Sequence, residues 1–252
     1  MLKTRLIPVL LLKQGRMVKT IQFDKERDVG NPVTTAKIYN AQNADELVFL
    51  DILASVEERD MLIDIINRVT EECFMPLTVG GGVKTLDDIR SLLKAGADKV
   101  SINSAAVENP KLIEAAARKF GSANIVASID FKDVQGAKKA VTHRGTHNTN
   151  LDPVAWAKEL QALGAGEIFL NNVDADGMMR GYDIQTIRAV SDAVSIPVIA
   201  CGGAGTLQDF VDAIREGHAS AVAAGSIFHF TDQSPIKARR FMHTAGLNVR
   251  MG

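Results

Sequence analysis

The chain has 252 residues, 46% of them hydrophobic and 23% charged, which is the composition of a globular protein and excludes a disordered or fibrous one. Its 29 basic and 30 acidic side chains give a formal net charge of -1, so charge gives no reason to expect a nucleic-acid or membrane partner. The longest apolar run near the start, residues 6–12, is too short to span a bilayer, and no signal peptide is evident. The two cysteines make neither a disulfide framework nor a metal cluster. We therefore expect a cytoplasmic α/β protein with no cofactor and no metal.

Short apolar runs alternate with longer amphipathic stretches along the whole chain. Most of the runs are continuous rather than alternating, which is typical of parallel strands buried on both faces. They predict strands at residues 5–12, 47–51, 77–79, 99–102, 124–130, 167–171, 197–201 and 220–223. Helix starts are expected where a capping residue precedes proline, at Asn109, Asp152 and Ser234. The stretches 13–31 and 132–149 are expected to be irregular.

An internal repeat indicates how these strands are arranged. Residues 79–88 (VGGGVKTLDD) correspond to residues 200–209 (ACGGAGTLQD), and residues 48–51 (VFLD) correspond to residues 168–171 (IFLN). Two four-stranded halves in tandem explain this repeat, whereas an open, doubly wound sheet has no reason to repeat in this way. The sequence therefore predicts one domain over residues 1–252, a single (β/α)8 barrel with half-barrels at about 1–122 and 123–252.

Two glycine clusters follow predicted strands and lead into helices. Glycine lets backbone N–H groups approach an anion, and a helix N-terminus favours negative charge. Each cluster lies beside a strand that ends in a short polar pair, so two phosphate cradles on one mouth would suit a substrate phosphorylated at both ends. The alternative is a tight turn without a ligand. The candidate residues are Gly81, Gly82, Asn103 and Ser104 in the first half, and Gly202, Gly203, Gly225 and Ser226 in the second.

Acidic residues at strand ends are the candidates for proton transfer. Asp130 closes the fifth strand, where a barrel places general acids and bases. Asp51 closes the second strand, whereas Asp174 and Asp176 after the sixth suit helix capping better. The repeat aligns residues 129–132 with 10–13, so Leu11 stands where a paired-carboxylate mechanism would need its second acid.

Charged residues also stand at the opposite ends of four strands. Their signs alternate, which is compatible with a ring of ion pairs at the barrel floor, although charges on this face are usually solvated. They are Arg5, Glu46, Lys99 and Glu167. Cys201 is interpreted as a packing residue because no histidine has an obvious claim to activate it, and His218 and His243 are expected on helices.

Seven segments spread along the chain form a recognisable set, at residues 45–52, 79–82, 97–103, 105–110, 164–168, 202–205 and 228–230. Together they resemble the cyclase subunits of imidazole glycerol phosphate synthases over essentially the full length of the chain. The resemblance implies a barrel that pairs with a glutaminase subunit and conducts its ammonia to the C-terminal face. There ammonia and a bis-phosphorylated ribulosyl carboxamide would give imidazole glycerol phosphate and an aminoimidazole carboxamide ribotide.

The resemblance also implies roles for particular residues. Asp130 would be one of two acid–base aspartates, Lys19 would lie on a mobile loop after the first strand, and Asp98 would lie at the partner interface. The four alternating charges would gate the ammonia channel. The residues expected at the phosphates are Gly82, Asn103, Ser104, Asp176, Gly177, Gly203 and Ser226.

The departures from this family pattern leave the acceptor open. Leu11 replaces the other catalytic aspartate, Ala175 replaces a usual arginine, and Asn171 and Cys201 replace small hydroxyl residues. Residues 10–13, 18–20 and 72–77 resemble a paralogous branch that amidates surface-polysaccharide sugars, whereas residues 246–250 resemble the histidine enzyme. A paralogue with another acceptor, a non-catalytic activator of a glutaminase, and a bis-phosphate isomerase barrel are the alternatives.

Overall fold

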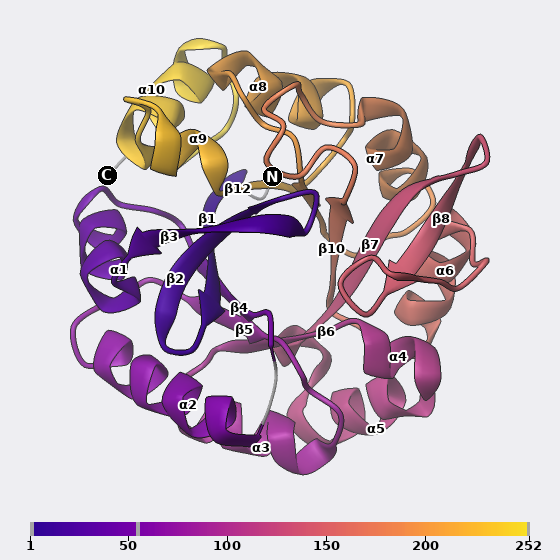
Figure 1. The fold of residues 1–252 in the computed structure, drawn as a ribbon. Coiled ribbons are helices and arrows are strands. Elements are labelled where there is room, and N and C mark those ends of the chain that lie inside the picture. Colours follow the sequence, from indigo (N-terminus) through magenta and orange to yellow (C-terminus); the bar gives the residue numbers. More distant parts are fainter. Residues whose placement is uncertain (1–2, 54–55, 251–252) are drawn as a thin grey trace.

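The computed structural model describes residues 3–53 and 56–250 and, within them, eight parallel strands that close into a barrel (Figure 1). Each strand pairs with the next, and the last pairs with the first. The strands are β1 (Arg5–Lys13), β4 (Leu47–Asp51), β5 (Leu77–Gly80), β6 (Lys99–Ile102), β7 (Ile125–Val134), β10 (Glu167–Asn172), β11 (Val198–Cys201) and β12 (Ala221–Ala224). The predicted (β/α)8 fold is confirmed.

Helices surround this barrel on all sides, as Figure 1 shows. They are α1 (Pro32–Ala41), α2 (Val56–Thr70), α3 (Leu86–Lys94), α4 (Ser104–Glu108), α5 (Lys111–Phe120), α6 (Pro153–Ala162), α7 (Ile184–Ser191), α8 (Leu207–Arg215), α9 (Ser226–Phe230) and α10 (Pro235–Thr244). Asp152 and Ser234 cap α6 and α10 as predicted, but α5 has Pro110 in the capping position and no side-chain cap. Over the described ranges, no helix combines the length and the apolarity needed to cross a membrane.

The alternation of side chains along each strand explains the continuous apolar runs. One set of side chains points out and packs under the helices, for example Leu6, Leu10 and Phe49. The other set points inward and fills the barrel, for example Ile7, Val48 and Phe169. Both faces of each strand are therefore buried.

The repeated segments form the same local structure in both halves. Thr85 caps α3 and Thr206 caps α8, each by accepting from the backbone N–H of the aspartate three residues on. Asp88 and Asp209 bond back to the backbone of the capping threonine, which completes a capping box at each helix. The exact limits of the half-barrels remain a prediction, and residues 1–2, 54–55 and 251–252 in them lie outside the described residues.

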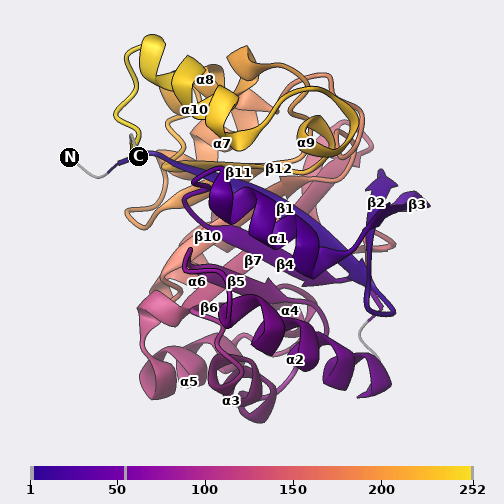
Figure 2. The same cartoon turned by 90° about the vertical axis from the view of Figure 1, so that its left-hand side faces the viewer.

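The two stretches expected to be irregular form antiparallel hairpins instead. The strands β2 (Arg16–Ile21) and β3 (Asp24–Gly30) extend β1, and the strands β8 (Ala137–Thr142) and β9 (His147–Asn148) extend β7. The chain turns back from β1 into β2 at Gln14-Gly15 and from β7 into β8 at Gln135-Gly136, and all four residues have positive φ. The prediction was wrong because the added strands are mostly polar and lack an apolar pattern. Figure 2 shows the β2–β3 hairpin standing out at one end of the barrel.

Candidate active site

A cavity of about 450 Å³ opens at the carboxyl ends of the barrel strands, beneath the two hairpins. Its walls come from strand ends, from the glycine turns and from the hairpins, so segments far apart in the sequence meet here. It is lined by every residue predicted for catalysis or phosphate binding: Lys19, Gly81, Gly82, Asn103, Ser104, Asp130, Asp176, Gly177, Gly202, Gly203, Gly225 and Ser226. The structure brings these residues together, and their roles remain predictions.

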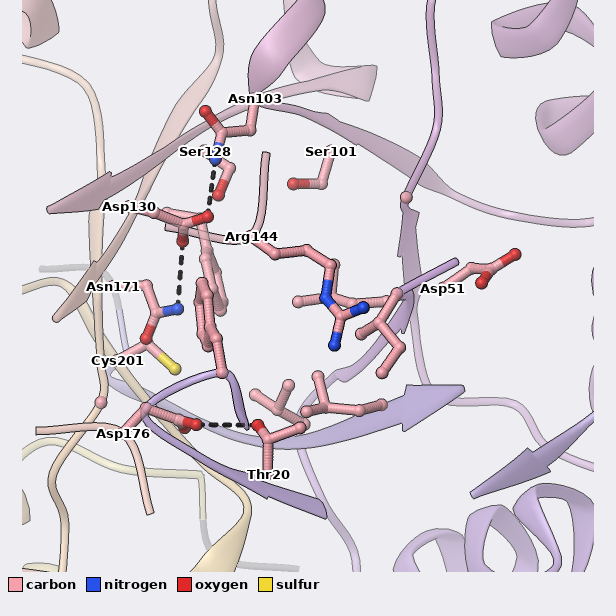
Figure 3. A pocket seen from close by; sticks show the side chains of 18 of the residues that line it. Thr20, Asp51, Ser101, Asn103, Ser128, Asp130, Arg144, Asn171, Asp176 and Cys201 are labelled. Carbon is pink, nitrogen blue, oxygen red and sulfur yellow. Dashed lines mark hydrogen bonds between the residues drawn. The ribbon is translucent and has the colours of Figure 1, made fainter. Parts of the chain in front are cut away.

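Asp130 lies at the wall of the cavity and is held by two side-chain amides (Figure 3). Asn103 donates from Nδ2 to Oδ2 at 2.6 Å, and Asn171 donates from Nδ2 to Oδ1 at 3.1 Å. Burial raises the pKa of Asp130 to about 6, although the two donors lower it, and the nearby Asp176 raises it further. The carboxyl group therefore changes charge close to neutral pH, as a general acid or base requires.

Lys19 is not on an irregular loop but on β2, where its side chain is buried. Its Nζ donates to both carboxylate oxygens of Asp176, at 2.9 and 3.0 Å, and to the carbonyl oxygen of Thr20 at 2.8 Å. The Thr20 hydroxyl donates to the same carboxylate at 3.0 Å. The ammonium group of Lys19 offsets the negative charge of Asp176 and so weakens its repulsion of a phosphate bound nearby.

The glycines of the predicted cradles are also required by backbone packing. A Cβ on Gly81 would lie 2.1 Å from the carbonyl oxygen of Asp51, and one on Gly202 would lie 2.4 Å from that of Asn172. The tight-turn interpretation therefore explains part of the glycine signal without a ligand. Among the described residues, however, Ser226 Oγ is buried, has no hydrogen-bond partner and lines the cavity. A phosphate oxygen would satisfy this hydroxyl group.

Leu11 lines the cavity on the opposite side of the barrel from Asp130, since β1 and β7 are separated by three strands in either direction. It pairs in register with Val18 on β2 and Leu50 on β4, so its surroundings there are apolar. Asp51 also lines the cavity and accepts from the Leu53 N–H at 3.0 Å. Asp174 instead accepts from the Asp133 N–H at 2.7 Å, outside the cavity wall.

The opposite end of the barrel carries the four alternating charges, and they form a ring of ion pairs. Arg5 Nη1 lies 2.7 Å from Glu46 and 3.0 Å from Glu167. Lys99 Nζ lies 2.9 Å from Glu46 and 3.1 Å from Glu167. The Glu46 side chain is only 1% exposed and also accepts from the Thr78 hydroxyl at 2.6 Å. These charges are therefore partly buried and paired, not solvated.

Asp98 lies beside this ring, at the start of β6, and is exposed. Its carboxylate accepts from the Leu77 N–H at 2.8 Å, and its carbonyl oxygen accepts from Asn124 Nδ2 at 2.7 Å. Asp98 therefore has a structural role between β5 and β6. Part of the Asp98 side chain is also exposed on the face of the barrel where a partner is predicted to bind.

A sequence model of the family described as histidine biosynthesis protein matches residues 5–234. The chain belongs to this family. The match begins with β1 and ends at the residue that caps α10, so it covers all eight barrel strands. Most histidine biosynthesis proteins of this family are enzymes. In the described part of this member, no three His, Cys, Asp or Glu side chains are grouped so that they could hold a metal ion.

Several residues that line the cavity of this histidine biosynthesis protein were not predicted from the sequence, among them the polar residues Thr20, Lys84, Ser101, Glu108 and Ser128. Three others, Phe23, His143 and Arg144, come from the turns that join β2 to β3 and β8 to β9. All three have positive φ, at 63°, 52° and 58°. No composition or spacing signal marks them, but the repeated Gln-Gly pairs could have revealed the hairpins that carry them.

Three further side chains were considered for chemistry. Cys201 is buried at the cavity wall, and burial raises the pKa of its thiol, which keeps it protonated. Its interpretation as a packing residue remains a prediction. His218 is not on a helix but follows α8 with φ of 56°, and its Nδ1 lies 2.6 Å from Asp192. His243 lies on α10, as predicted, and is exposed.

Proposed function

We propose that this chain is the ammonia-using synthase subunit of a glutamine amidotransferase complex of the imidazole glycerol phosphate synthase type. A glutaminase binds the end of the barrel that carries the ion-pair ring and releases ammonia there. The ammonia passes along the barrel and reacts with a phosphorylated acceptor in the cavity at the other end.

The observation that carries this proposal is the position of the ring and the cavity at opposite ends of one barrel. Between them the interior is lined largely by apolar side chains such as Ile7, Val126 and Phe169. Such a lining favours passage of neutral ammonia over ammonium, because a charge is costly to move out of water. An isomerase that converts a bis-phosphate within the cavity has no use for the ring, so the ring favours a synthase.

The cavity supplies what the reaction needs. The glycine turns hold the two phosphates, with Ser226 as one side-chain donor. Ammonia adds to a carbonyl carbon, whose oxygen must gain a proton while the nitrogen loses one. Asp130, with a pKa of about 6, takes and returns these protons near neutral pH. A barrel that only activated a glutaminase would need neither this carboxyl group nor the cavity.

Leu11 favours a second candidate, a paralogue that passes the same ammonia to a sugar of a surface polysaccharide. Leucine cannot move a proton, and ring closure to an imidazole calls for more proton transfers than formation of one C–N bond. With Asp130 as the acid–base group at the strand ends, the simpler amidation is the less demanding reaction.

The test is reconstitution with the glutaminase encoded nearest to this chain. We expect a one-to-one complex in size-exclusion chromatography and glutamine-dependent conversion of the bis-phosphorylated ribulosyl carboxamide. Amidation of a sugar acceptor without that conversion would select the paralogue. Separate elution of the two proteins, with and without ligand, would contradict the complex.

A further inference from the structure

Arg144 is a cation at the cavity mouth to which no role has been assigned above. It lies in the turn between β8 and β9 and lines the cavity, and its side chain is 43% exposed. Figure 3 shows its guanidinium group reaching over the middle of the cavity, between Asp130 on one side and Asp51 on the other. The guanidinium group of Arg144 is therefore exposed partly to the cavity, between the two glycine turns, and partly to bulk solvent.

The backbone beside Arg144 is fastened to the first glycine cradle. The N–H of His143 donates to the hydroxyl oxygen of Ser104 at 3.1 Å, and His143 Nε2 lies 3.3 Å from Glu108 on the same short helix. Lys132 Nζ donates to the carbonyl oxygen of Gly145 at 2.7 Å. These contacts hold the backbone on either side of Arg144 in place, while its long side chain extends across the mouth of the cavity.

Arg144 forms an ion pair with Glu26, a carboxylate that also pairs with a second cation. Its Nη2 donates to Glu26 Oε1 at 3.0 Å, from β8–β9 across to β3. The other oxygen of Glu26 accepts from Lys13, so one carboxylate serves two cations. A guanidinium group has five N–H donors, and a partly exposed ion pair is worth little. An anion entering the cavity can therefore replace Glu26 at small cost.

Two lysines also line the cavity, but Arg144 is the cation whose charged group reaches over its middle (Figure 3). Lys19 is paired with both oxygens of Asp176, and Lys84 is exposed beside the first glycine turn. The carboxylates that face the cavity are Asp51, Glu108, Asp130 and Asp176, and none of them has a hydrogen bond to Arg144 among the described residues. The planar fork of arginine matches the two oxygens of a carboxylate or phosphate.

We propose that Arg144 is a specificity-determining residue that binds an oxyanion of the substrate between the two glycine cradles by exchanging Glu26 for it. The inference rests on the proposed function in one respect, since it takes the cavity to bind a phosphorylated small molecule. The oxyanion is either a carboxylate of the substrate or a phosphate seated in the cradle beside Ser104.

The test is calorimetric titration of the whole chain with phosphogluconate and with sorbitol phosphate. The two probes carry a phosphate on the same terminal carbon and differ only in the carboxylate at the other end. The variants are Arg144→Gln and Glu26→Gln. The matched control is Arg16→Gln, because Arg16 pairs with Asp28 within the β2–β3 hairpin, is 64% exposed and does not line the cavity.

We expect Arg144→Gln to weaken binding about ten-fold, as loss of a charge-assisted contact does, and Arg16→Gln to leave it unchanged. Glu26→Gln should leave binding unchanged or strengthen it, because it removes a competitor for the guanidinium group. If Arg144→Gln weakens only phosphogluconate, the carboxylate is the anion; equal weakening of both probes assigns the phosphate.

Three results would overturn the proposal: no effect of Arg144→Gln, equal weakening by Arg144→Gln and Glu26→Gln, or no binding of either probe to the wild type at millimolar concentration. If the two variants weakened binding equally, the Arg144–Glu26 pair would be a structural link between the hairpins and not a binding element. These titrations use neither glutaminase nor ammonia. A failure of the proposed amidotransferase therefore leaves them interpretable, and a failure here leaves the ammonia proposal standing.

Discussion

Lys19 and Asp176 form a bidentate ion pair that joins the first quarter of the chain to the loop after β10, with Nζ 2.9 Å from Oδ1 and 3.0 Å from Oδ2. The backbone N–H of Gln22 donates to the carbonyl oxygen of Asp176 at 2.9 Å and strengthens the same contact. A Cβ on Gly177 would lie 2.5 Å from the carbonyl oxygen of Thr20, so the two segments touch closely. The β2–β3 hairpin is therefore fastened over the cavity by a largely buried charge pair.

The first prediction concerns this ion pair. Lys19→Met leaves the Asp176 carboxylate without its cation, and breaking a buried pair in this way typically costs about 3 kcal/mol. We expect that loss in the free energy of unfolding, measured with urea, and faster amide hydrogen exchange in β2 and β3. Arg118→Gln is the control, because its pair with Glu114 is exposed and its loss should cost less than about 0.5 kcal/mol. Unchanged exchange in Lys19→Met would show that backbone contacts alone hold the hairpin.

The second prediction concerns the pH dependence of turnover. The pKa of Asp130 is raised from 3.8 to about 6, so the base form is lost as the pH falls through about 6. If Asp130 begins the reaction as a base, kcat/KM for the acceptor should fall on the acid side of that value when the concentration of free ammonia is held constant across the pH series. Asp130→Asn should lose about 10²–10⁴-fold in rate and show no such acid limb. An acid limb that persists in Asp130→Asn would assign it to another group.

The third prediction concerns the pH at which this acid limb of kcat/KM falls. Asn171 donates to the Asp130 carboxylate at 3.1 Å and so favours its charged form. Asn171→Ala removes the donor, which raises the pKa of Asp130 and shifts the acid limb of kcat/KM to higher pH. Gln161→Ala is a distant control, since Gln161 bonds Ser195 and Ile196 outside the cavity. A shift to lower pH in Asn171→Ala would contradict the assignment of the limb to Asp130.

The sequence predicted the barrel well because its strands are buried on both faces and its two halves repeat. Two predicted strands, 47–51 and 99–102, agree with the observed ones at both ends, and the others differ by one residue at one or both ends, except that β7 runs on to Val134 in its hairpin. The cavity residues at strand ends were predicted for the same reason, since a closed barrel brings those ends together. Their proximity follows from the topology and needs no knowledge of side-chain contacts.

The contacts made by the hairpins could not be predicted in this way. The strand Asp24–Gly30 is mostly charged and exposed, so it has no apolar pattern to mark it. Without the hairpins, nothing in the sequence places Lys19 against Asp176 or Arg144 against Glu26. These pairs are tertiary contacts, and they depend on how the hairpins fold over the mouth.

The fourth prediction concerns the ion-pair ring. Lys99 contacts Glu46 and Glu167 and faces the end of the barrel where the glutaminase is proposed to bind. Lys99→Ala should lower glutamine-dependent turnover more than turnover with added ammonium, because ammonium can reach the cavity from its open side. Both rates are measured on the same complex. Equal losses under the two conditions would instead assign Lys99 a role in holding the fold.

The fifth prediction restores an acid at position 11. Leu11 is 8% exposed, lines the cavity and stands on the barrel wall opposite Asp130. Aspartate is of similar length, so Leu11→Asp should fold, at a cost of about 1–3 kcal/mol for partly burying a polar group beside Val18 and Leu50. Thermal unfolding measures this cost, and a folded variant is the condition for the activity assay.

Leu11→Asp should also gain imidazole glycerol phosphate formation, because one positioned acid or base supplies about 10²–10⁴-fold in rate. The assay supplies ammonium, so that no glutaminase is needed, and compares wild type, Leu11→Asp, and Leu11→Asp combined with Asp130→Asn. A gain in the single variant that vanishes in the double variant indicates a two-acid site interrupted at position 11. Wild-type turnover as fast as that of Leu11→Asp would show that position 11 is dispensable. No product from the folded single variant would favour the sugar acceptor, because the missing acid would then not be what prevents ring closure.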